Sequence, residues 1–306
     1  MDSTANFRIA AAAAAFAVVV GLFPACGGSD GAGPSPGPRA GADQPLEGTR
    51  VSGRDEALQI VARGVVAPLY FSELAHAVLA HALVLRASAH GDALPLSSGD
   101  RWLLTLDAQS LGASATLDGP VAIDIEAADN VEGLMLRGEP GFVRAVLRFE
   151  RVALGAAAHV DGAMVLEVSR TSAAAGAARR SQADVLSIAD ASRTLRWSYL
   201  DVAVDAHALV QRLTVVSDVP VNEAGPVWLD ATSSAPGRLG PMPAGTALFS
   251  GRYVASGVIG FLKARLMLHV GADGGWTIDV DNDKDDRVDF VVHASAHEVR
   301  GLMPGL

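Results

Sequence analysis

From about residue 100 onward, hydrophobic and polar positions alternate along the chain with a period of two. Within residues 142–154 one face is hydrophobic, and residues 164–169, 276–281 and 288–292 repeat the alternation. This pattern is typical of half-buried antiparallel strands. About twelve candidate strands can be recognised in this way. The pattern predicts a mainly all-β fold, built as an antiparallel curved sheet or as a sandwich.

Short glycine-containing segments punctuate the alternating stretches: Asp118-Gly119-Pro120, Asp161-Gly162 and Gly274-Gly275. Such segments favour tight turns, so each is predicted to join two strands in a hairpin. The first two follow an apolar residue and begin strands of similar pattern. This similarity is either a duplicated unit or a recurring hairpin pattern, and the spacing leaves both open.

Residues 54–87 have the spacing of a helix, with apolar residues three and four positions apart. Pro68 is predicted to divide this helical segment, because an interior proline removes a hydrogen bond and clashes with the preceding turn. The second part, from about Phe71, is apolar on most faces and is predicted to pack on the sheet or inside a half-barrel. A membrane-spanning helix is the alternative, and Glu73 and His76 disfavour it.

The N-terminus has the features of an export signal. The apolar run over residues 9–23 is too short to span a bilayer and fits the core of a signal peptide. Cys26, the only cysteine, follows it between small residues. This arrangement resembles the lipobox of bacterial lipoproteins, in which the signal peptide is cut before the cysteine and the cysteine is acylated. The resemblance implies a signal peptide over residues 1–25, lipidation of Cys26 and, because Gly27 follows, sorting to the outer membrane.

The segment departs from the usual lipobox pattern at Phe23 and Pro24. An ordinary signal peptide, cut for instance after Gly27, and an uncleaved membrane anchor are the alternatives. Residues 26–45 are rich in Gly, Pro and Ser and are predicted to be a lipid-anchored flexible tether. Residues 46–306 are predicted to form a single β-rich domain.

Composition narrows the classes of partner. Half of the residues are hydrophobic and 19% are charged, which is typical of a globular body. The net charge of −10 disfavours nucleic acid as a partner, because phosphates would be repelled. The membrane, reached through the lipid at Cys26, is therefore the one partner that the sequence predicts, and a protein or ligand partner is left open.

The strongest local candidate for chemistry is the acidic segment 273–289, which contains seven aspartates. Its alternating carboxylates are similar to the first half of an EF-hand-type calcium loop, where positions 1, 3 and 5 converge on one ion. The sixth position, normally Gly, is Asp286, and the twelfth, normally a bidentate Glu, is Val292. The alternative is a plain hairpin tip, in which Asp and Asn are good turn formers. The predicted calcium ligands are Asp279, Asp281, Asp283, Asp285 and Asp289.

No catalytic motif is recognisable, so no catalytic residue is predicted. A G-x-S-x-G match at residues 27–31 lies in the tether and not between a strand and a helix, where a nucleophile elbow belongs. His293 and His297 are predicted to share one strand, where four positions separate them too widely for one metal ion. Two pairs of acidic residues stand at alternating strand positions and are predicted to lie on solvated faces: Asp124 with Glu126, and Asp201 with Asp205.

Together these features resemble a class of uncharacterised envelope lipoproteins of myxobacteria and related Gram-negative bacteria. The matching residues are Cys26 and the segments 117–119, 160–162 and 279–289. The class carries no established activity, so the resemblance implies a non-enzymatic structural or binding protein of the envelope, which calcium could stabilise. The alternatives are a surface-anchored hydrolase acting on polysaccharide and a carrier of an apolar ligand.

Overall fold

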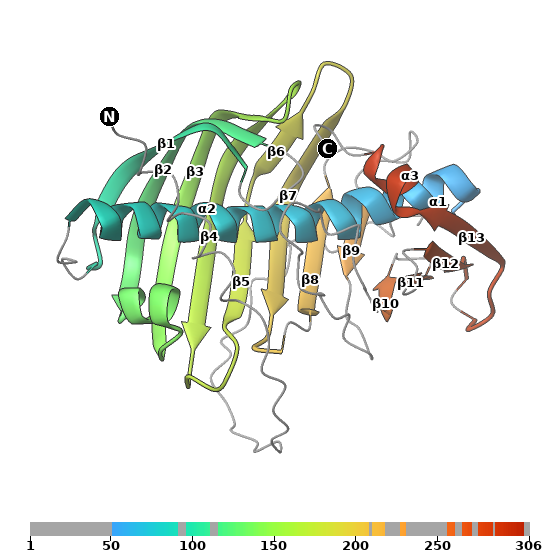
Figure 1. The fold of residues 1–306 in the computed structure, drawn as a ribbon. Coiled ribbons are helices and arrows are strands. Elements are labelled where there is room, and N and C mark those ends of the chain that lie inside the picture. Colours follow the sequence, from blue (N-terminus) through green and yellow to red (C-terminus); the bar gives the residue numbers. More distant parts are fainter. Residues whose placement is uncertain are drawn as a thin grey trace, which may run out of the picture.

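The fold is known from a computed structural model, which describes residues 51–90, 96–110, 116–207, 210–217, 227–230, 256–260, 265–270, 275–283 and 285–302. The signal peptide, Cys26 and tether predicted from the sequence lie outside these ranges. Figure 1 shows the arrangement of the described elements, with one long helix lying across a large curved sheet.

The sheet is an antiparallel meander in which each strand lies beside the next one along the chain. The one exception is β6, which pairs with β4 and β7 as a continuation of β5. The strands are β1 (Arg101–Ser110), β2 (Thr116–Asp129), β3 (Gly141–Leu154), β4 (Ala158–Arg170), β5 (Ala178–Ala183), β6 (Leu186–Ala189), β7 (Thr194–Val204), β8 (Val210–Ser217), β9 (Val227–Asp230), β10 (Ser256–Gly260), β11 (Arg265–Val270), β12 (Gly275–Asp281) and β13 (Phe290–Ser295).

The sheet has a larger and a smaller part. The strands from β1 to β8 form the larger part, and β9 adds four residues to its edge. Among the described residues, one pair, Asp230 with Gly260, joins β9 to β10 and so to the smaller part, β10 to β13. The alternating sequence pattern therefore predicted the fold class correctly, because strands with one buried face must pair in this antiparallel way.

The helical segment consists of α1 (Arg54–Val61), the π-helical turn η2 (Ala62–Val66) and α2 (Ala67–His90). The prediction that Pro68 divides this segment is wrong, because the helix continues through it. The ring of a proline clashes with the carbonyl four residues earlier, here that of Gly64. Gly64 lies in η2, which is wider than an α-helical turn. The wider turn makes room for the ring of Pro68, so the helix does not end there.

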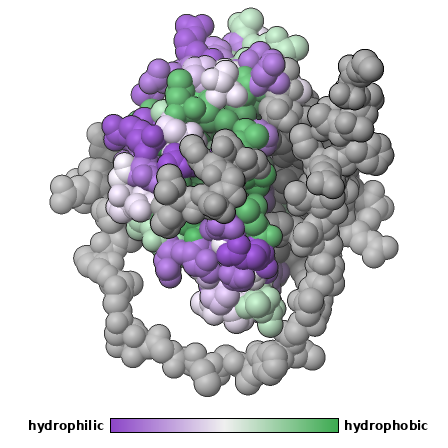
Figure 2. Space-filling model, turned by 60° about the vertical axis from the view of Figure 1, so that its left-hand side comes forward, coloured by the Kyte–Doolittle hydropathy of each residue, from purple (hydrophilic) through white to green (hydrophobic). Residues whose placement is uncertain are grey.

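The helix lies on the face of the sheet that forms the core (Figure 1). Phe71 of α2 is 1% exposed, and its ring lies 6.2 Å from that of Phe149 in β3 and 6.4 Å from that of Trp197 in β7. The helix is long and apolar enough to cross a bilayer, but 67% of its most apolar stretch is buried in the fold. Figure 2, seen from the β1 side, shows hydrophobic residues as a band between hydrophilic ones, where this core reaches the end of the layer.

The segments 118–120 and 161–162 are not turns, as the sequence pattern suggested, but lie inside the long strands β2 and β4. Gly119 and Gly162 have φ angles of 126° and 128°, and the pairing of both strands with β3 shifts register beside them. They mark β-bulges, for which an interior glycine is typical. The two segments thus resemble each other because each forms a bulge in a strand that pairs with β3.

Candidate metal centre and the polar networks around the helix

The acidic segment forms the loop between β12 and β13. The two strands pair up to Val280 and Phe290, and the N–H of Asp289 donates to the carbonyl oxygen of Val280 at 2.7 Å. This bond closes the hairpin, so the aspartates between these positions are held in one compact loop.

Three of the five predicted ligands converge in this loop. Asp281, Asp283 and Asp285 each place a carboxylate oxygen within 4.8 Å of the others. Asp281 ends β12 and is 1% exposed, whereas Asp283 and Asp285 are exposed. The alternation that places their side chains on one side of the loop is the arrangement by which positions 1, 3 and 5 of a calcium loop surround an ion.

The backbone of the loop folds around the Asp281 carboxylate. The N–H groups of Asp285 and Asp286 donate to its two oxygens at 3.3 Å and 3.2 Å. Asp286 has a φ angle of 65°, the left-handed conformation that glycine usually supplies at the sixth position of a calcium loop. Asp is one of the few other residues that tolerate this conformation. The missing glycine therefore does not prevent the turn.

The other two predicted ligands lie outside the group. Asp279 lies within β12, opposite Val291 of β13 and Met267 of β11. Asp289 instead accepts a hydrogen bond from the N–H of Asn282 at 2.7 Å. Val292, at the twelfth position, is a buried residue of β13 and offers no oxygen ligand from its side chain. The structure thus supplies one half of a calcium loop.

The loop is tied to the beginning of the described chain. Asn282 stands between two of the converging aspartates and makes two hydrogen bonds to the backbone of Val51. Its Oδ1 accepts from the Val51 N–H at 2.7 Å, and its Nδ2 donates to the Val51 carbonyl at 3.2 Å. Any ordering of the acidic loop therefore also orders the segment that enters α1.

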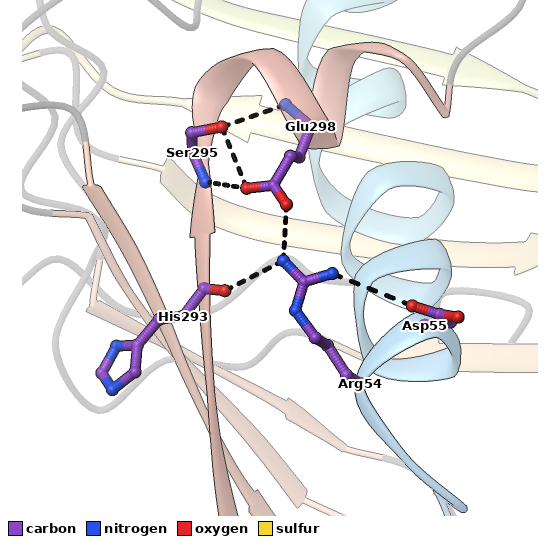
Figure 3. A network of polar contacts seen from close by, with 5 residues as sticks. All are labelled: Arg54, Asp55, His293, Ser295 and Glu298. Carbon is purple, nitrogen blue, oxygen red and sulfur yellow. Dashed lines mark hydrogen bonds and ion pairs between the residues drawn. The ribbon is translucent and has the colours of Figure 1, made fainter.

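A second contact holds the start of α1 against the C-terminal helix α3 (Ala296–Arg300), as Figure 3 shows. Arg54 donates to Glu298 at 2.6 Å and to the carbonyl oxygen of His293 at 3.3 Å. Ser295 and Glu298 form a capping box, each accepting from the backbone of the other. The backbone N–H of Ser295 and then Arg54 lower the pKa of Glu298 to about 2.

His293 and His297, which were predicted to share a strand, lie on different elements. His293 belongs to β13, whereas His297 lies in α3, and both are exposed. The strand ends at Ser295 because its hydroxyl caps the following helix.

A buried polar cluster, which sequence reasoning did not find, joins α2 to β5. Ser181 of β5 lies 2.7 Å from the hydroxyl of Ser72 and 3.0 Å from Nε2 of His76. Beside them, Arg179 donates to Glu73 at 2.5 Å. His76 lies four positions after Ser72 and three after Glu73, so it is a neighbour of each on the helix surface, a signal that was readable in the sequence. Their strand partners could not be identified, because they depend on where the helix crosses the sheet.

This cluster is sealed from solvent. Ser181 is 0% exposed and His76 is 6% exposed. Burial, and then the charge of Arg179, lower the pKa of His76 to about 3, so its imidazole is neutral at pH 7. A serine beside a neutral imidazole can in principle act as a nucleophile, but in this closed interface no substrate can reach it.

Charges of alternating sign cross the opposite face of the sheet. Arg179 and Ser181 of β5 contact α2. Because successive side chains of a strand alternate between its faces, Arg180 points away from α2. It donates to Asp201 at 2.9 Å and 3.0 Å, and Arg212 donates to the same carboxylate at 3.2 Å. One residue from each of β2, β3, β4, β5, β7 and β8 takes part: Glu126, Arg144, Glu167, Arg180, Asp201 and Arg212.

The prediction that Asp201 lies on a solvated face is wrong, because its side chain is 1% exposed. Asp124 is also largely covered, at 14%, between Arg101 and Arg148. Long arginine side chains on neighbouring strands cover these shorter carboxylates. The pairing register between strands decides which arginine lies beside which carboxylate. The pattern of a single strand therefore could not predict that Asp201 and Asp124 are covered.

The predicted lipidation site, Cys26, lies outside the described residues, so the geometry of the fold bears only on the acidic loop and the polar networks. Comparison of the chain with protein-family models, with curated proteins and with solved structures finds no match.

Proposed function

We propose that this protein is a lipid-anchored lipoprotein of the bacterial envelope, without enzymatic activity, whose C-terminal hairpin binds calcium. The observation that carries the calcium proposal is the convergence of Asp281, Asp283 and Asp285 within 4.8 Å. Close carboxylates repel one another unless a cation lies between them. Calcium prefers such hard oxygen ligands, and loop carbonyls and water would complete its coordination.

The ion would serve a structural purpose. It would hold Asp281 and Asp283 in place on either side of Asn282, whose side chain binds the backbone of Val51. The predicted tether, residues 26–45, lies a few residues before Val51 in the chain, so the ion would strengthen the fold near the point where the pull of a membrane anchor enters it. This role fits a structural or binding protein at the outer membrane.

Two observations support a non-enzymatic role. The Ser181–His76 contact is enclosed between α2 and β5, where a substrate has no access. Four carboxylates of the outer face are engaged by arginines: Asp124, Glu126, Glu167 and Asp201. A polysaccharide hydrolase needs one carboxylate that can be protonated and one that is free to act as base or nucleophile.

The carrier alternative needs an apolar cavity for its ligand. Between α2 and the middle of the sheet, the space is occupied by Phe71, packed against Phe149 and Trp197. No observation on the described residues favours this alternative over the structural role.

Thermal unfolding of the full chain, first in EDTA and then in millimolar calcium, tests the proposal. A ligand that binds only the folded state raises the unfolding midpoint. For an affinity typical of extracellular calcium modules, the expected rise is about 2–4 °C. Asp283→Asn and Asp285→Asn should each abolish most of this rise.

Asp184→Asn is the matched control, because Asp184 is also an exposed aspartate and lies between β5 and β6, away from the loop. This variant changes the net charge equally and should keep the full rise. Identical midpoints in EDTA and in calcium would refute the calcium proposal and leave the acidic segment as a solvated hairpin tip.

A further inference from the structure

The two edge strands of the sheet, β1 and β13, differ in how far they are protected. The backbone of β13 is engaged from its open side, because the carbonyl oxygen of His293 accepts a hydrogen bond from Arg54 at 3.3 Å. In the part of the chain that the structure describes, no strand pairs with the side of β1 that faces away from β2. An open edge presents N–H and C=O groups that can pair with a strand of another chain.

The hydrogen bonds to β2 show which backbone groups of β1 face this open side. The N–H of Ile125 in β2 donates to the carbonyl oxygen of Asp100, just before β1, at 2.8 Å. Bonding alternates along an antiparallel ladder, so the even-numbered residues of 102–106 bond to β2. The backbone groups of the residues between and before them face the open side: Arg101, Leu103 and Thr105.

β1 lacks most of the features that prevent an edge strand from pairing. It is 10 residues long, longer than most strands, and it contains neither proline nor lysine. Its pairing with β2 is regular from Arg101 to Leu106, and the one bulge comes after that stretch. Leu103, in the middle of the regular stretch, is 64% exposed. A long edge strand with an exposed leucine favours the addition of a further strand.

The exposed side chains of β1 are complementary to those of a second copy. Arg101 and Asp107 stand at the two ends of the exposed row, with Leu103 and Thr105 between them. If two antiparallel copies of β1 are centred on Leu104, Arg101 of each copy lies opposite Asp107 of the other. Opposite charges that face each other across a strand pair attract. This register also joins the backbone groups that face away from β2, because residues opposite each other are both odd-numbered.

The guanidinium of Arg101 is available for this second contact. It donates to Asp124 of its own sheet, but its side chain is 75% exposed. A guanidinium has five N–H donors, so one carboxylate does not use them all.

Apolar side chains also reach the surface at this edge. Trp102 is only partly buried, and the guanidinium of Arg86 lies 4.6 Å above the centre of its ring. The neighbouring Leu85 of α2 is 45% exposed. Figure 2 shows hydrophobic residues at the surface on this side of the molecule. In the register centred on Leu104, Trp102 lies opposite Leu106 of the second copy, so strand pairing also covers apolar surface.

We propose that two copies of this chain pair through β1 and so join their sheets into one antiparallel sheet across a twofold axis at Leu104. The contact uses the same surface of both copies, so it closes as a dimer. A head-to-tail contact between β1 and β13 is disfavoured, because Arg54 occupies the backbone of β13. The proposal rests neither on the calcium site nor on the lipid anchor.

Co-purification of two differently tagged copies tests the dimer. Both full-length copies are expressed in one host, extracted with detergent in EDTA and isolated through the tag of one copy, and the recovery of the other copy is measured. Wild-type copies should be recovered together. Leu103→Lys in both copies should remove most of this recovery, because a lysine on an edge strand opposes pairing.

Val291→Lys is the matched control, because Val291 is 46% exposed and lies on β13, the other edge strand. This variant should keep the full recovery. Loss of recovery with Val291→Lys would indicate a contact between β1 and β13 and would overturn the proposal.

Exchange of the two charged residues tests the register. Asp107→Arg in both copies places arginines opposite each other, and Arg101→Asp in both copies places aspartates opposite each other. In each case the recovery should fall at least about tenfold, because like charges then meet twice in the dimer.

One copy with Asp107→Arg and one with Arg101→Asp should be recovered together again, since every facing pair then has opposite charges. Restored recovery would also show that both variants fold. Wild-type copies that do not co-purify, unchanged recovery with Leu103→Lys, or a mixed pair without restored recovery would each overturn the proposal.

Discussion

Single glycines determine where the long strands bend. Gly162 adopts a φ angle of 128°, a conformation that residues with a Cβ atom rarely enter. A Cβ atom at this position would lie 2.5 Å from the carbonyl oxygen of Val185 and 3.0 Å from the Cα atom of Leu186. Both contacts are to backbone, which cannot move aside as a flexible side chain can. The glycine is therefore required both by its dihedral angle and by the closeness of the neighbouring strand.

Replacing Gly162 by alanine should lower the free energy of unfolding by about 2–4 kcal/mol, because strain and steric overlap add. The control is Gly99→Ala, since Gly99 has a φ angle of 94° but a Cβ atom there would meet nothing within 4 Å. That variant should lose only the strain contribution, about 1–2 kcal/mol. Urea unfolding of both variants measures the difference. Equal losses would show that the contact with Val185 contributes nothing.

Asp286 is a second residue whose backbone conformation matters more than its side chain. The sequence comparison with calcium loops counted it as a departure, because glycine is usual at the sixth position. In the folded loop it takes the left-handed conformation that this position requires. The departure that remains is Val292, whose place in the buried face of β13 leaves the loop without a twelfth ligand.

At the scale of elements, α2 is held on the sheet by apolar packing and by one buried polar cluster. Ser72, Glu73 and His76 all face β5, and their partners there are Ser181 and Arg179. Nδ1 of His76 and one oxygen of Glu73 have no hydrogen-bond partner in the described structure. A buried imidazole nitrogen without a partner makes the interface depend on the protonation state of His76.

Because of His76, the free energy of unfolding should decrease as the pH is lowered. Its pKa is about 3 in the folded protein and 6.5 in an unperturbed chain. The unfolded chain therefore takes up a proton first as the pH falls. The contribution of His76 to stability is complete above pH 6.5 and is lost progressively toward pH 3. Between pH 6.5 and 4 the loss is at most about 3 kcal/mol.

Urea unfolding at several pH values, with His76→Gln as the comparison, isolates this contribution. Acidic groups also titrate as the pH falls, and Glu298 does so below pH 4.5 in the unfolded chain. These groups are common to both proteins, so the difference between the two pH profiles belongs to position 76. Parallel profiles would contradict a neutral, buried His76.

At the scale of the whole molecule, the beginning and the end of the fold are joined. In the part of the chain that the structure describes, the smaller part of the sheet meets the larger one at one residue pair, Asp230 with Gly260. Its firmer connections are to the start of the helix, through Asn282 to Val51 and through Glu298 to Arg54. The helix thus bridges the two parts of the sheet, because α1 contacts β13 while α2 crosses β4 and β7.

The proposed lipid anchor at Cys26 predicts that the protein is acylated and bound to the membrane in its host. Wild-type protein should incorporate labelled palmitate and sediment with the outer membrane, because acylation converts the sole thiol into a lipid attachment. Cys26→Ser should lose the label and leave the membrane fraction. A wild-type chain that is released without label would instead identify an ordinary signal peptide, and label retained by Cys26→Ser would place the lipid elsewhere.

The sequence by itself determined the features that depend on neighbours along the chain. Alternation with a period of two predicted the antiparallel strands, and the three- and four-residue spacing predicted the helix. The spacing of Asp281, Asp283 and Asp285 brought their carboxylates together, because one short loop suffices to do so. In each case the geometry of a single element carries the information.

Only the tertiary structure decided which distant residues meet. The bulges at Gly119 and Gly162 were mistaken for turns, because a dipeptide does not reveal whether a strand continues past it. The partners of Asp201 depend on the register of three strands, and those of His76 depend on where α2 crosses β5. The bond from Trp197 to the carbonyl oxygen of Arg63 likewise exists only after η2 is placed on β7. Register and crossing position arise from packing the whole sheet, and no local pattern encodes them.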